Sequence, residues 1–151
     1  MIKETDNRFY IKESTIEEAG NGLFAKEKLK KNDYLEIIGV EVEVGSIADK
    51  CTEFSDNYKF ASGLEISDDQ YNFTRKIIPC GYGGIVNHTK DPKLQNVNLG
   101  YTPNTPRNAN AYGVIYKFSR DIEPDEELLG DYGDYWNKIF KWAEEKNKKI
   151  D

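Results

Sequence analysis

The chain breaks into many short stretches in which apolar and polar residues alternate, and turns rich in glycine, asparagine and aspartate separate them. The clearest stretch covers residues 34–44 and ends in Val40-Glu41-Val42-Glu43-Val44. Alternation with a period of two places successive side chains on opposite faces of a strand. We therefore predict a mainly-β protein whose strands turn one face to the core and the other to water.

The remaining pattern predicts one compact unit. Further strands are expected at residues 8–13, 23–27, 58–61, 64–66, 96–100 and 111–118, with a short helix within 46–57, a helical turn within 80–87 and a loop at 103–110. Helical spacing of Trp136, Ile139, Phe140 and Ala143 predicts an amphipathic helix over about 134–148. Because 151 residues suit one domain, we expect a single domain over 1–151 with its core at about 8–136.

Charge and hydropathy exclude some function classes. The formal net charge is −6, and a general nucleic-acid binder would need a basic stripe. An acidic chain can attract a basic peptide, although the charge can equally serve solubility alone. No apolar run approaches the roughly 20 residues that a membrane span requires, and no apolar signal segment opens the chain. We thus expect neither nucleic acid nor membrane as a direct partner.

Metal and disulfide frameworks are also unexpected. The chain has two cysteines, Cys51 and Cys80, and one histidine, His88, which cannot form a zinc cluster of ordinary spacing. We expect both cysteines to be reduced, core-lining residues of an intracellular protein. The sequence does not distinguish cytoplasm from nucleus.

Three segments carry residue types suited to a binding site. Gly20-Asn21-Gly22 allows close backbone approach to a ligand, although a plain hairpin turn would use the same residues. Asn87-His88 follows a glycine-rich stretch, and its amide can orient a polar ligand, although a lone histidine is often structural. Aromatic residues around Gly130 and Gly133 suit a flat or cationic group, or simple packing.

Taken together and in order, these segments resemble a SET domain, most closely the compact single-domain viral type. The resemblance rests on Gly20-Asn21-Gly22-Leu23-Phe24-Ala25, on the stretch from Gly81 to Pro92 that contains Gly83-Gly84-Ile85-Val86-Asn87-His88, and on Arg120 to Gly133 with Asp131-Tyr132-Gly133 at its end. It covers about residues 8–136. SET domains transfer methyl groups from S-adenosylmethionine to lysine side chains of proteins.

The resemblance implies a β-clip fold of several small curved sheets. It also implies a pseudoknot, in which the segment carrying Tyr132 passes under a loop beside Asn87-His88. Threading of this kind is rare, and it would bring residues that are distant in sequence into one site.

The resemblance implies a role for each candidate residue. Tyr132 matches the catalytic tyrosine, and Tyr58 resembles a tyrosine that lines the channel for the substrate lysine. The residues implied to contact S-adenosylmethionine are Gly20, Asn21, Gly22, Leu23, Asn87, His88, Tyr135 and Trp136. No zinc is expected.

One position departs from the family pattern. Gly130 stands where SET domains usually carry a sizeable residue that limits the number of methyl groups added. Two outcomes stay open: the space permits higher methylation, or Tyr112 or Tyr116 fills it. The zinc-binding cysteine clusters that flank many histone-directed members are absent from the sequence.

The preferred interpretation is a protein-lysine methyltransferase whose substrate is a lysine-containing protein or peptide, with a histone tail as one candidate. The alternative is a catalytically silent SET-fold module that binds a basic peptide. The resemblance to compact members of this type is also compatible with a homodimer of this chain. The target lysine and the degree of methylation are not specified by the sequence.

Overall fold

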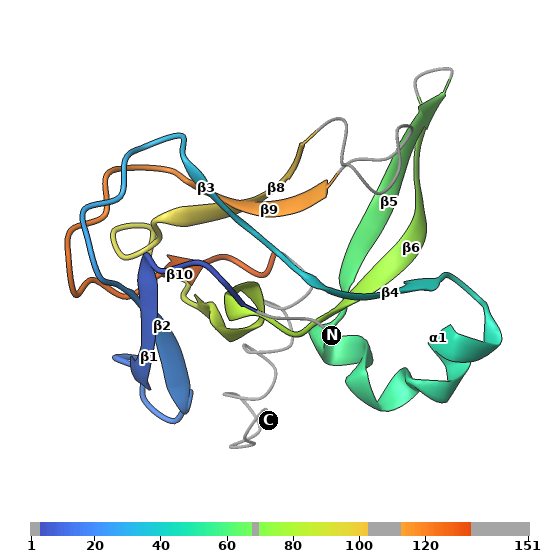
Figure 1. Cartoon of the computed structure of the whole chain (residues 1–151), viewed down its shortest axis with the longest axis horizontal. Coiled ribbons are helices and arrows are strands. Elements are labelled where there is room, and N and C mark those ends of the chain that lie inside the picture. The colour runs from blue at the N-terminus through green and yellow to red at the C-terminus, as the bar shows by residue number, and fades with distance from the viewer. Residues whose placement is uncertain (1–3, 68–69, 103–112, 134–151) are drawn as a thin grey trace.

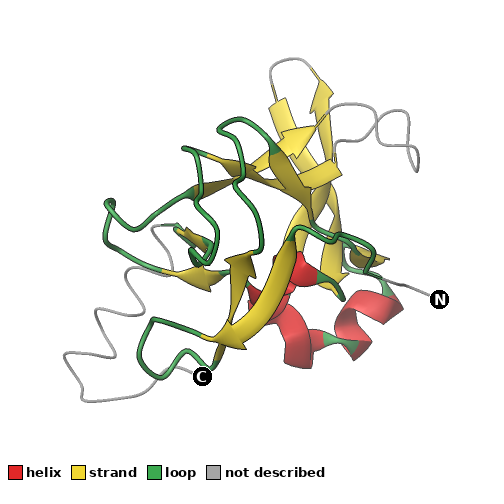
Figure 2. Ribbon diagram, turned by 60° about the vertical axis from the view of Figure 1, so that its left-hand side comes forward, coloured by secondary structure: helices red, strands yellow, loops and turns green. Residues whose placement is uncertain are grey.

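The computed structural model describes residues 4–67, 70–102 and 113–133 of the chain. Within these ranges the strands form two two-stranded and two three-stranded sheets, with three short helical segments between them (Figures 1 and 2). The predicted mainly-β fold of several small sheets is confirmed. The predicted loop at 103–110 and the predicted terminal helix at 134–148 lie outside the described residues.

The N-terminal sheet is an antiparallel hairpin of β1 (Phe9–Glu13) and β2 (Asn21–Ala25). The second strand begins two residues before the predicted 23–27 and ends two residues before it. Residues 22–25 of β2 are all buried, because β2 also bonds on its other side to a segment from the far end of the chain.

The stretch that looked like one strand over 34–44 is two strands in different sheets, so that prediction is wrong. β3 (Tyr34–Glu36) pairs with β9 (Gly113–Phe118), which also pairs with β8 (Val97–Thr102). β4 (Gly39–Glu43) joins the other three-stranded sheet. The chain changes sheet at Ile37 and Ile38, whose backbones bond to Val114 and to Cys80. This change of sheet requires glycine at position 39, because a Cβ there would clash with the carbonyl oxygen of Ile78 at a distance of 2.0 Å.

The second three-stranded sheet has the order β4-β6-β5 and includes the long hairpin of β5 (Phe60–Ser67) and β6 (Gln70–Pro79). The two strands predicted at 58–61 and 64–66 are thus one strand. Between β4 and β5 lie α1 (Ile47–Cys51) and the 3-10 helix η1 (Glu53–Tyr58), which confirm the short helix expected within 46–57. The Ser46 hydroxyl caps α1 by accepting from the Asp49 amide at 3.2 Å.

Both cysteines are free, but they are exposed, so the prediction that they line the core is wrong. Cys51 ends the short helix α1, and Cys80 follows directly after the end of β6. Neither residue lies within a strand whose face the core covers.

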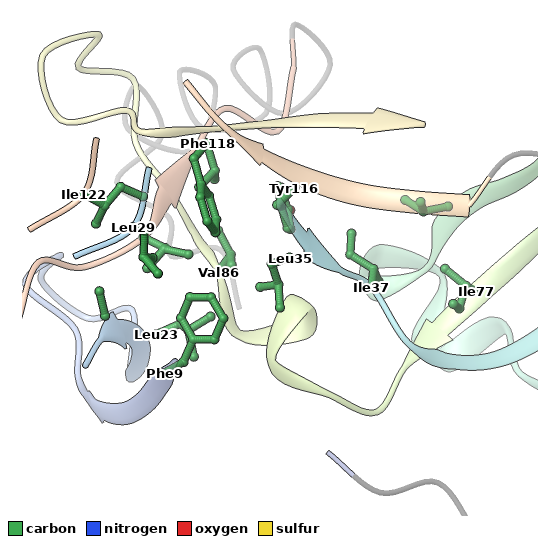
Figure 3. Close-up of a cluster of buried hydrophobic side chains, with 14 residues drawn as sticks. Phe9, Leu23, Leu29, Leu35, Ile37, Ile77, Val86, Tyr116, Phe118 and Ile122 are labelled. Carbon is green, nitrogen blue, oxygen red and sulfur yellow. The ribbon is translucent and has the colours of Figure 1, made fainter. Parts of the chain in front are cut away.

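One hydrophobic core runs between the sheets, from the β1–β2 hairpin to β6 (Figure 3). Its buried members are Phe9, Leu23, Ala25, Leu29, Leu35, Ile37, Ile77, Val86, Val97, Val114, Tyr116, Phe118, Ile122 and Leu128. Phe9 connects the layers through edge-to-face contacts with Tyr82 at 5.9 Å and with Phe118 at 6.4 Å between ring centroids. None of the described helices is long and apolar enough to cross a membrane.

The smallest sheet joins the middle of the chain to its later part. The 3-10 helix η2 (Tyr82–Ile85) leads into β7 (Asn87–His88), which pairs in parallel with β10 (Leu129–Gly130). At the start of the loop after β7, the Thr89 amide donates a hydrogen bond to the Gly130 carbonyl at 2.9 Å. At the end of this loop, the Asn96 amide donates to the Leu129 carbonyl, also at 2.9 Å. The loop therefore begins and ends on the β10 segment, while the threading of a pseudoknot stays a prediction.

The side chain of Asn96 holds the β10 segment in place through hydrogen bonds. It is fully buried, its amide donates to the Glu127 carbonyl at 2.8 Å, and its Oδ1 accepts from the Leu129 amide at 2.8 Å. The same amide lies 3.1 Å from Glu126, which also pairs with Arg120. One asparagine thus satisfies two backbone groups that the core would otherwise leave without partners.

Asn96→Ala should lower the free energy of unfolding by about 3 kcal/mol, because an unsatisfied buried polar group costs ~1–3 kcal/mol and two are created. Denaturant unfolding measures the change. The control is Asn98→Ala on the exposed face of β8, which should stay within about 0.5 kcal/mol of wild type. Equal stability of the two variants would show that Asn96 does not fasten the segment.

Candidate functional site

The three segments that the sequence singled out meet around the β7–β10 pair. The side-chain amide of Asn87 donates to the backbone carbonyl of Asn21 at 2.9 Å. The backbone amide of Tyr132 donates to Nδ1 of His88 at 2.9 Å. The chain therefore brings the glycine turn, the Asn87-His88 pair and the Tyr132 segment into direct contact.

A buried carboxylate, that of Glu127, holds two of these segments together. Its side chain accepts from the Ser14 hydroxyl at 2.6 Å, from the Thr15 amide at 2.8 Å, from the Thr15 hydroxyl, and from the Asn87 amide at 3.3 Å. Glu127 is only 5% exposed, so these donors replace the water that the charge has lost.

Gly22 is where this carboxylate approaches β2. A Cβ at this position would lie 2.1 Å from Glu127 Oε1, so only glycine leaves room. Gly20, by contrast, has a positive φ of 75° and open space around its Cβ position, and Asn21 is exposed beside it. Residues 20 and 21 therefore lie at the exposed surface, with their carbonyls bonded to the Ser14 amide and to Asn87, while Gly22 serves packing.

Leu23 lies in a different environment from Gly20 and Asn21. Its side chain is fully buried in the core, and its carbonyl accepts from the Leu128 amide at 2.8 Å. The structure therefore places Leu23 behind the exposed edge of the glycine turn.

Tyr132 is anchored at three points. Its hydroxyl donates to the Val86 carbonyl at 2.9 Å, its ring lies 4.9 Å from the ring of His88, and its amide bonds to that histidine. Burial of the hydroxyl end raises the pKa of Tyr132 to about 12, and the nearby phenol of Tyr58 adds to the rise. At neutral pH the residue is thus a fixed, uncharged phenol.

His88 has its Nδ1 occupied as an acceptor, so the hydrogen of the neutral ring lies on Nε2. Its side chain is 7% exposed, and a carboxylate oxygen of Asp131 lies 3.8 Å from Nδ1. The histidine therefore orients the Tyr132 segment through its ring, and its backbone belongs to the β7–β10 ladder.

Tyr58 ends η1 and is 60% exposed, and its phenol is close enough to Tyr132 to contribute to the raised pKa of that residue. The next residue fixes it in place: Lys59 Nζ is buried between Asp49 at 3.0 Å and Asp56 at 2.6 Å. Lys76 on β6 lies 3.2 Å from the same Asp49. This ion-pair cluster attaches the helical insert that carries Tyr58 to the β4-β6-β5 sheet.

Gly130 is buried in β10 beside Tyr116 of β9. A Cβ on Gly130 would lie 3.2 Å from Val97 Cγ2 and 3.7 Å from Tyr116 Cε1. Of the two residues expected as candidates to fill the space at Gly130, the described structure thus places Tyr116 next to it. The other, Tyr112, lies outside the described residues, as do Tyr135 and Trp136.

Sequence reasoning missed Glu127 and Asn96. In the sequence, Glu127 stands inside a longer motif and Asn96 at the start of a predicted strand, so neither stands out. A carboxylate directly before Leu128-Leu129 in a buried stretch is a signal that could have singled out Glu127. Within the described ranges, no group of three or more histidine, cysteine or acidic side chains is placed to hold a metal ion.

Comparison with known proteins gives one family match. The SET domain family matches residues 20–133 of the chain. A search of curated protein sequences returned no match. The matched range contains the glycine turn, Asn87-His88 and the Tyr132 segment.

Solved structures share the fold. A Plasmodium falciparum protein assigned as a histone methyltransferase is 26% identical over 89% of this chain and 99% of its own, with a TM-score of 0.52. CpSET8 from Cryptosporidium is 24% identical over 83% of this chain and 57% of its own, with a TM-score of 0.58. A Chaetomium thermophilum polycomb repressive complex 2 bound to S-adenosylmethionine is 18% identical over 90% of this chain, with a TM-score of 0.57. The chain spans 17% of that protein's length and 15% of other chains from this complex.

Glu127→Gln should destabilise the protein by about 2 kcal/mol, because an amide nitrogen cannot accept the hydrogen bonds that the carboxylate receives. Denaturant unfolding measures the loss, and Glu36→Gln on an exposed position of β3 is the matched control. If both variants unfold at the wild-type midpoint, the hydrogen bonds of Glu127 to Ser14, Thr15 and Asn87 do not stabilise the site.

Proposed function

Because the chain belongs to the SET-domain family, we propose that it transfers a methyl group from S-adenosylmethionine to the ε-amine of a lysine in a protein or peptide. The observation that carries the proposal is Tyr132, a neutral phenol fixed by Val86 and His88. Tyr132 follows two residues after the end of β10, which pairs with β7.

The accessible polar groups fit the cofactor. Gly20 and Asn21 are exposed beside Asn87, and Gly20 leaves open space. Backbone amides and carbonyls with one side-chain amide suit the amino-acid and adenine parts of S-adenosylmethionine, which need both donors and acceptors. When bound, this cofactor supplies an electrophilic methyl group on a positively charged sulfur. Tyr135 and Trp136 are proposed to cover the adenine.

The substrate lysine has to react as a neutral amine, although the pKa of a free lysine is about 10.4. A narrow apolar channel that excludes water disfavours the ammonium form, and a nearby positive sulfur repels it, so both lower the pKa of the amine. Tyr58 and the neutral Tyr132, both partly exposed, are proposed to line that channel. The proton can leave to water, so the proposal requires no protein base.

Tyr132 is proposed to orient the reacting groups. Its raised pKa makes it a poor base at neutral pH, whereas its fixed oxygen can restrain the methyl group and the amine. Transfer requires nitrogen, methyl carbon and sulfur in line, with reacting atoms roughly 3–3.5 Å apart. Alignment rather than proton transfer is thus the proposed contribution of this residue.

A basic protein segment is the proposed substrate class. The net charge of −6 favours encounter with such a segment, and a histone tail is one candidate. The Plasmodium falciparum neighbour assigned as a histone methyltransferase supports that candidate.

Asn87→Ala should weaken binding of S-adenosylmethionine by about tenfold, because it removes the amide that holds the Asn21 carbonyl in place. Titration calorimetry of the purified protein measures the affinity, and Asn98→Ala is the control. Equal affinity of Asn87→Ala and wild type would contradict the cofactor role of Asn87.

Tyr132→Phe should leave cofactor binding nearly unchanged but reduce methyl transfer by about a hundredfold or more. Transfer of labelled methyl groups to core histones measures the effect, and Tyr34→Phe, on an exposed residue of β3, is the control. Full activity of a folded Tyr132→Phe would contradict its role. Binding of histone peptides without transfer by the wild type would favour the alternative, a silent peptide-binding module.

A further inference from the structure

His88 receives a hydrogen bond that only its neutral form can accept. The backbone amide of Tyr132 donates to Nδ1 of His88 at 2.9 Å. A protonated imidazole carries a hydrogen on both ring nitrogens, so it has no lone pair left to accept this bond. The bond that ties the Tyr132 backbone to β7 is therefore present only while Nδ1 is unprotonated.

A carboxylate is placed to become the partner of Nδ1 when the ring gains a proton. Asp131 Oδ1 lies 3.8 Å from Nδ1, which is too far for a hydrogen bond to the neutral ring. The same oxygen accepts from the Gly133 amide at 2.8 Å. A protonated ring would donate to this carboxylate in a charge-assisted bond and would release the Tyr132 amide. Residues 131–133 thus offer two alternative partners to one ring nitrogen.

Other ionisable groups lie around the ring of His88 on neighbouring segments. The Tyr132 ring is 4.9 Å away, and burial raises the pKa of its phenol to about 12, so this group stays neutral where histidine titrates. Glu127 bonds to the residue before His88, and Lys90 and Asp91 follow in the next loop. His88 is the only histidine of the chain, so an imidazole that changes charge near neutral pH is this one.

We propose that His88 is a positioning residue for Tyr132 and that it fulfils this role only as the neutral ring. Gain of a proton on Nδ1 exchanges the Tyr132 amide for the Asp131 carboxylate as the partner of the ring. We call this exchange of partners the His88 switch. This inference rests on the proposed methyl transfer and adds a control by pH to the same site.

The His88 switch acts on the phenol of Tyr132 through the backbone. The hydroxyl of Tyr132 donates to the Val86 carbonyl at 2.9 Å, and protonation of His88 leaves this bond intact. A side chain that is held at its hydroxyl but released at its backbone can tilt about that oxygen. Transfer requires the reacting groups in line, so a tilt lowers the rate although the site stays assembled. Loss of one hydrogen bond corresponds to a decrease of about two- to tenfold.

The first test follows the His88 switch without cofactor or substrate. Protein labelled with ¹⁵N and carrying no histidine tag is titrated by NMR from about pH 8 to about pH 5, the range in which histidine changes charge. The ring signals need no assignment, because the chain has one histidine. The Tyr132 amide signal should change with the same midpoint as the ring. The Leu129 amide, which donates to the non-titrating Asn96 Oδ1 at 2.8 Å, is the matched control and should change far less.

Two variants make this titration specific. In His88→Asn the side-chain oxygen takes nearly the place of Nδ1 and accepts without titrating, so the Tyr132 amide should no longer respond in this range. Asp131→Asn keeps an acceptor for the Gly133 amide but removes the charge that favours the protonated ring, so the midpoint of the ring should move to lower pH.

The outcomes of the titration separate this inference from the proposed function. Different midpoints for the ring and the Tyr132 amide, or a ring that does not titrate in this range, would overturn the inference and leave the proposed function standing. An unmoved midpoint in Asp131→Asn would contradict the part assigned to that carboxylate.

The second test measures methyl transfer to core histones at saturating S-adenosylmethionine over the same pH range. Wild type and His88→Asn share the pH dependence of the substrate lysine, so the ratio of their rates isolates the effect of the histidine. This ratio should fall by about two- to tenfold as the pH decreases, whereas His88→Leu, which cannot accept the bond, should be slow throughout. A constant ratio would overturn the positioning role. Absence of transfer by the wild type at every pH would contradict the proposed function, and the NMR titration would still decide whether the His88 switch exists.

Discussion

A parallel pairing of only two residues on each side, β7 with β10, holds the candidate site together. A ladder this short is weak by itself, and parallel strands must be joined by a long connection. The buried side chains of Asn96 and Glu127 reinforce it: Asn96 bonds to the backbone of the β10 segment, and Glu127 joins that segment to Asn87 and to Thr15 in the loop after β1. The core and the site thus depend on the same few hydrogen bonds.

This arrangement explains how the described residues order the candidate site through hydrogen bonds and packing. Val86 and His88 leave the Tyr132 phenol little freedom, and the buried Lys59 pairs fix the insert that carries Tyr58. Polar groups held in this way lose little entropy when a ligand arrives. The exposed edge at Gly20 and Asn21 remains accessible for binding.

Local pattern predicted much of the fold, because alternation and turn residues act over a few positions. The strands at β1, β8 and β9 and the insert of α1 and η1 follow from it. The split of residues 34–44 between two sheets depends on contacts with Ile78 and Val114, which no local window contains. Likewise, Gly22 looked like a flexible turn residue, yet its role is to admit Glu127, whose burial depends on a segment far along the chain.

The most direct test of the account is amide hydrogen exchange with and without S-adenosylmethionine. If the β7–β10 pairing assembles one cofactor site, binding should slow exchange together in the glycine turn, in residues 87–89 and in residues 129–133, with little change in β5 and β6. Protection confined to one of these segments, or located in β5 and β6, would show that the pairing does not build the cofactor site.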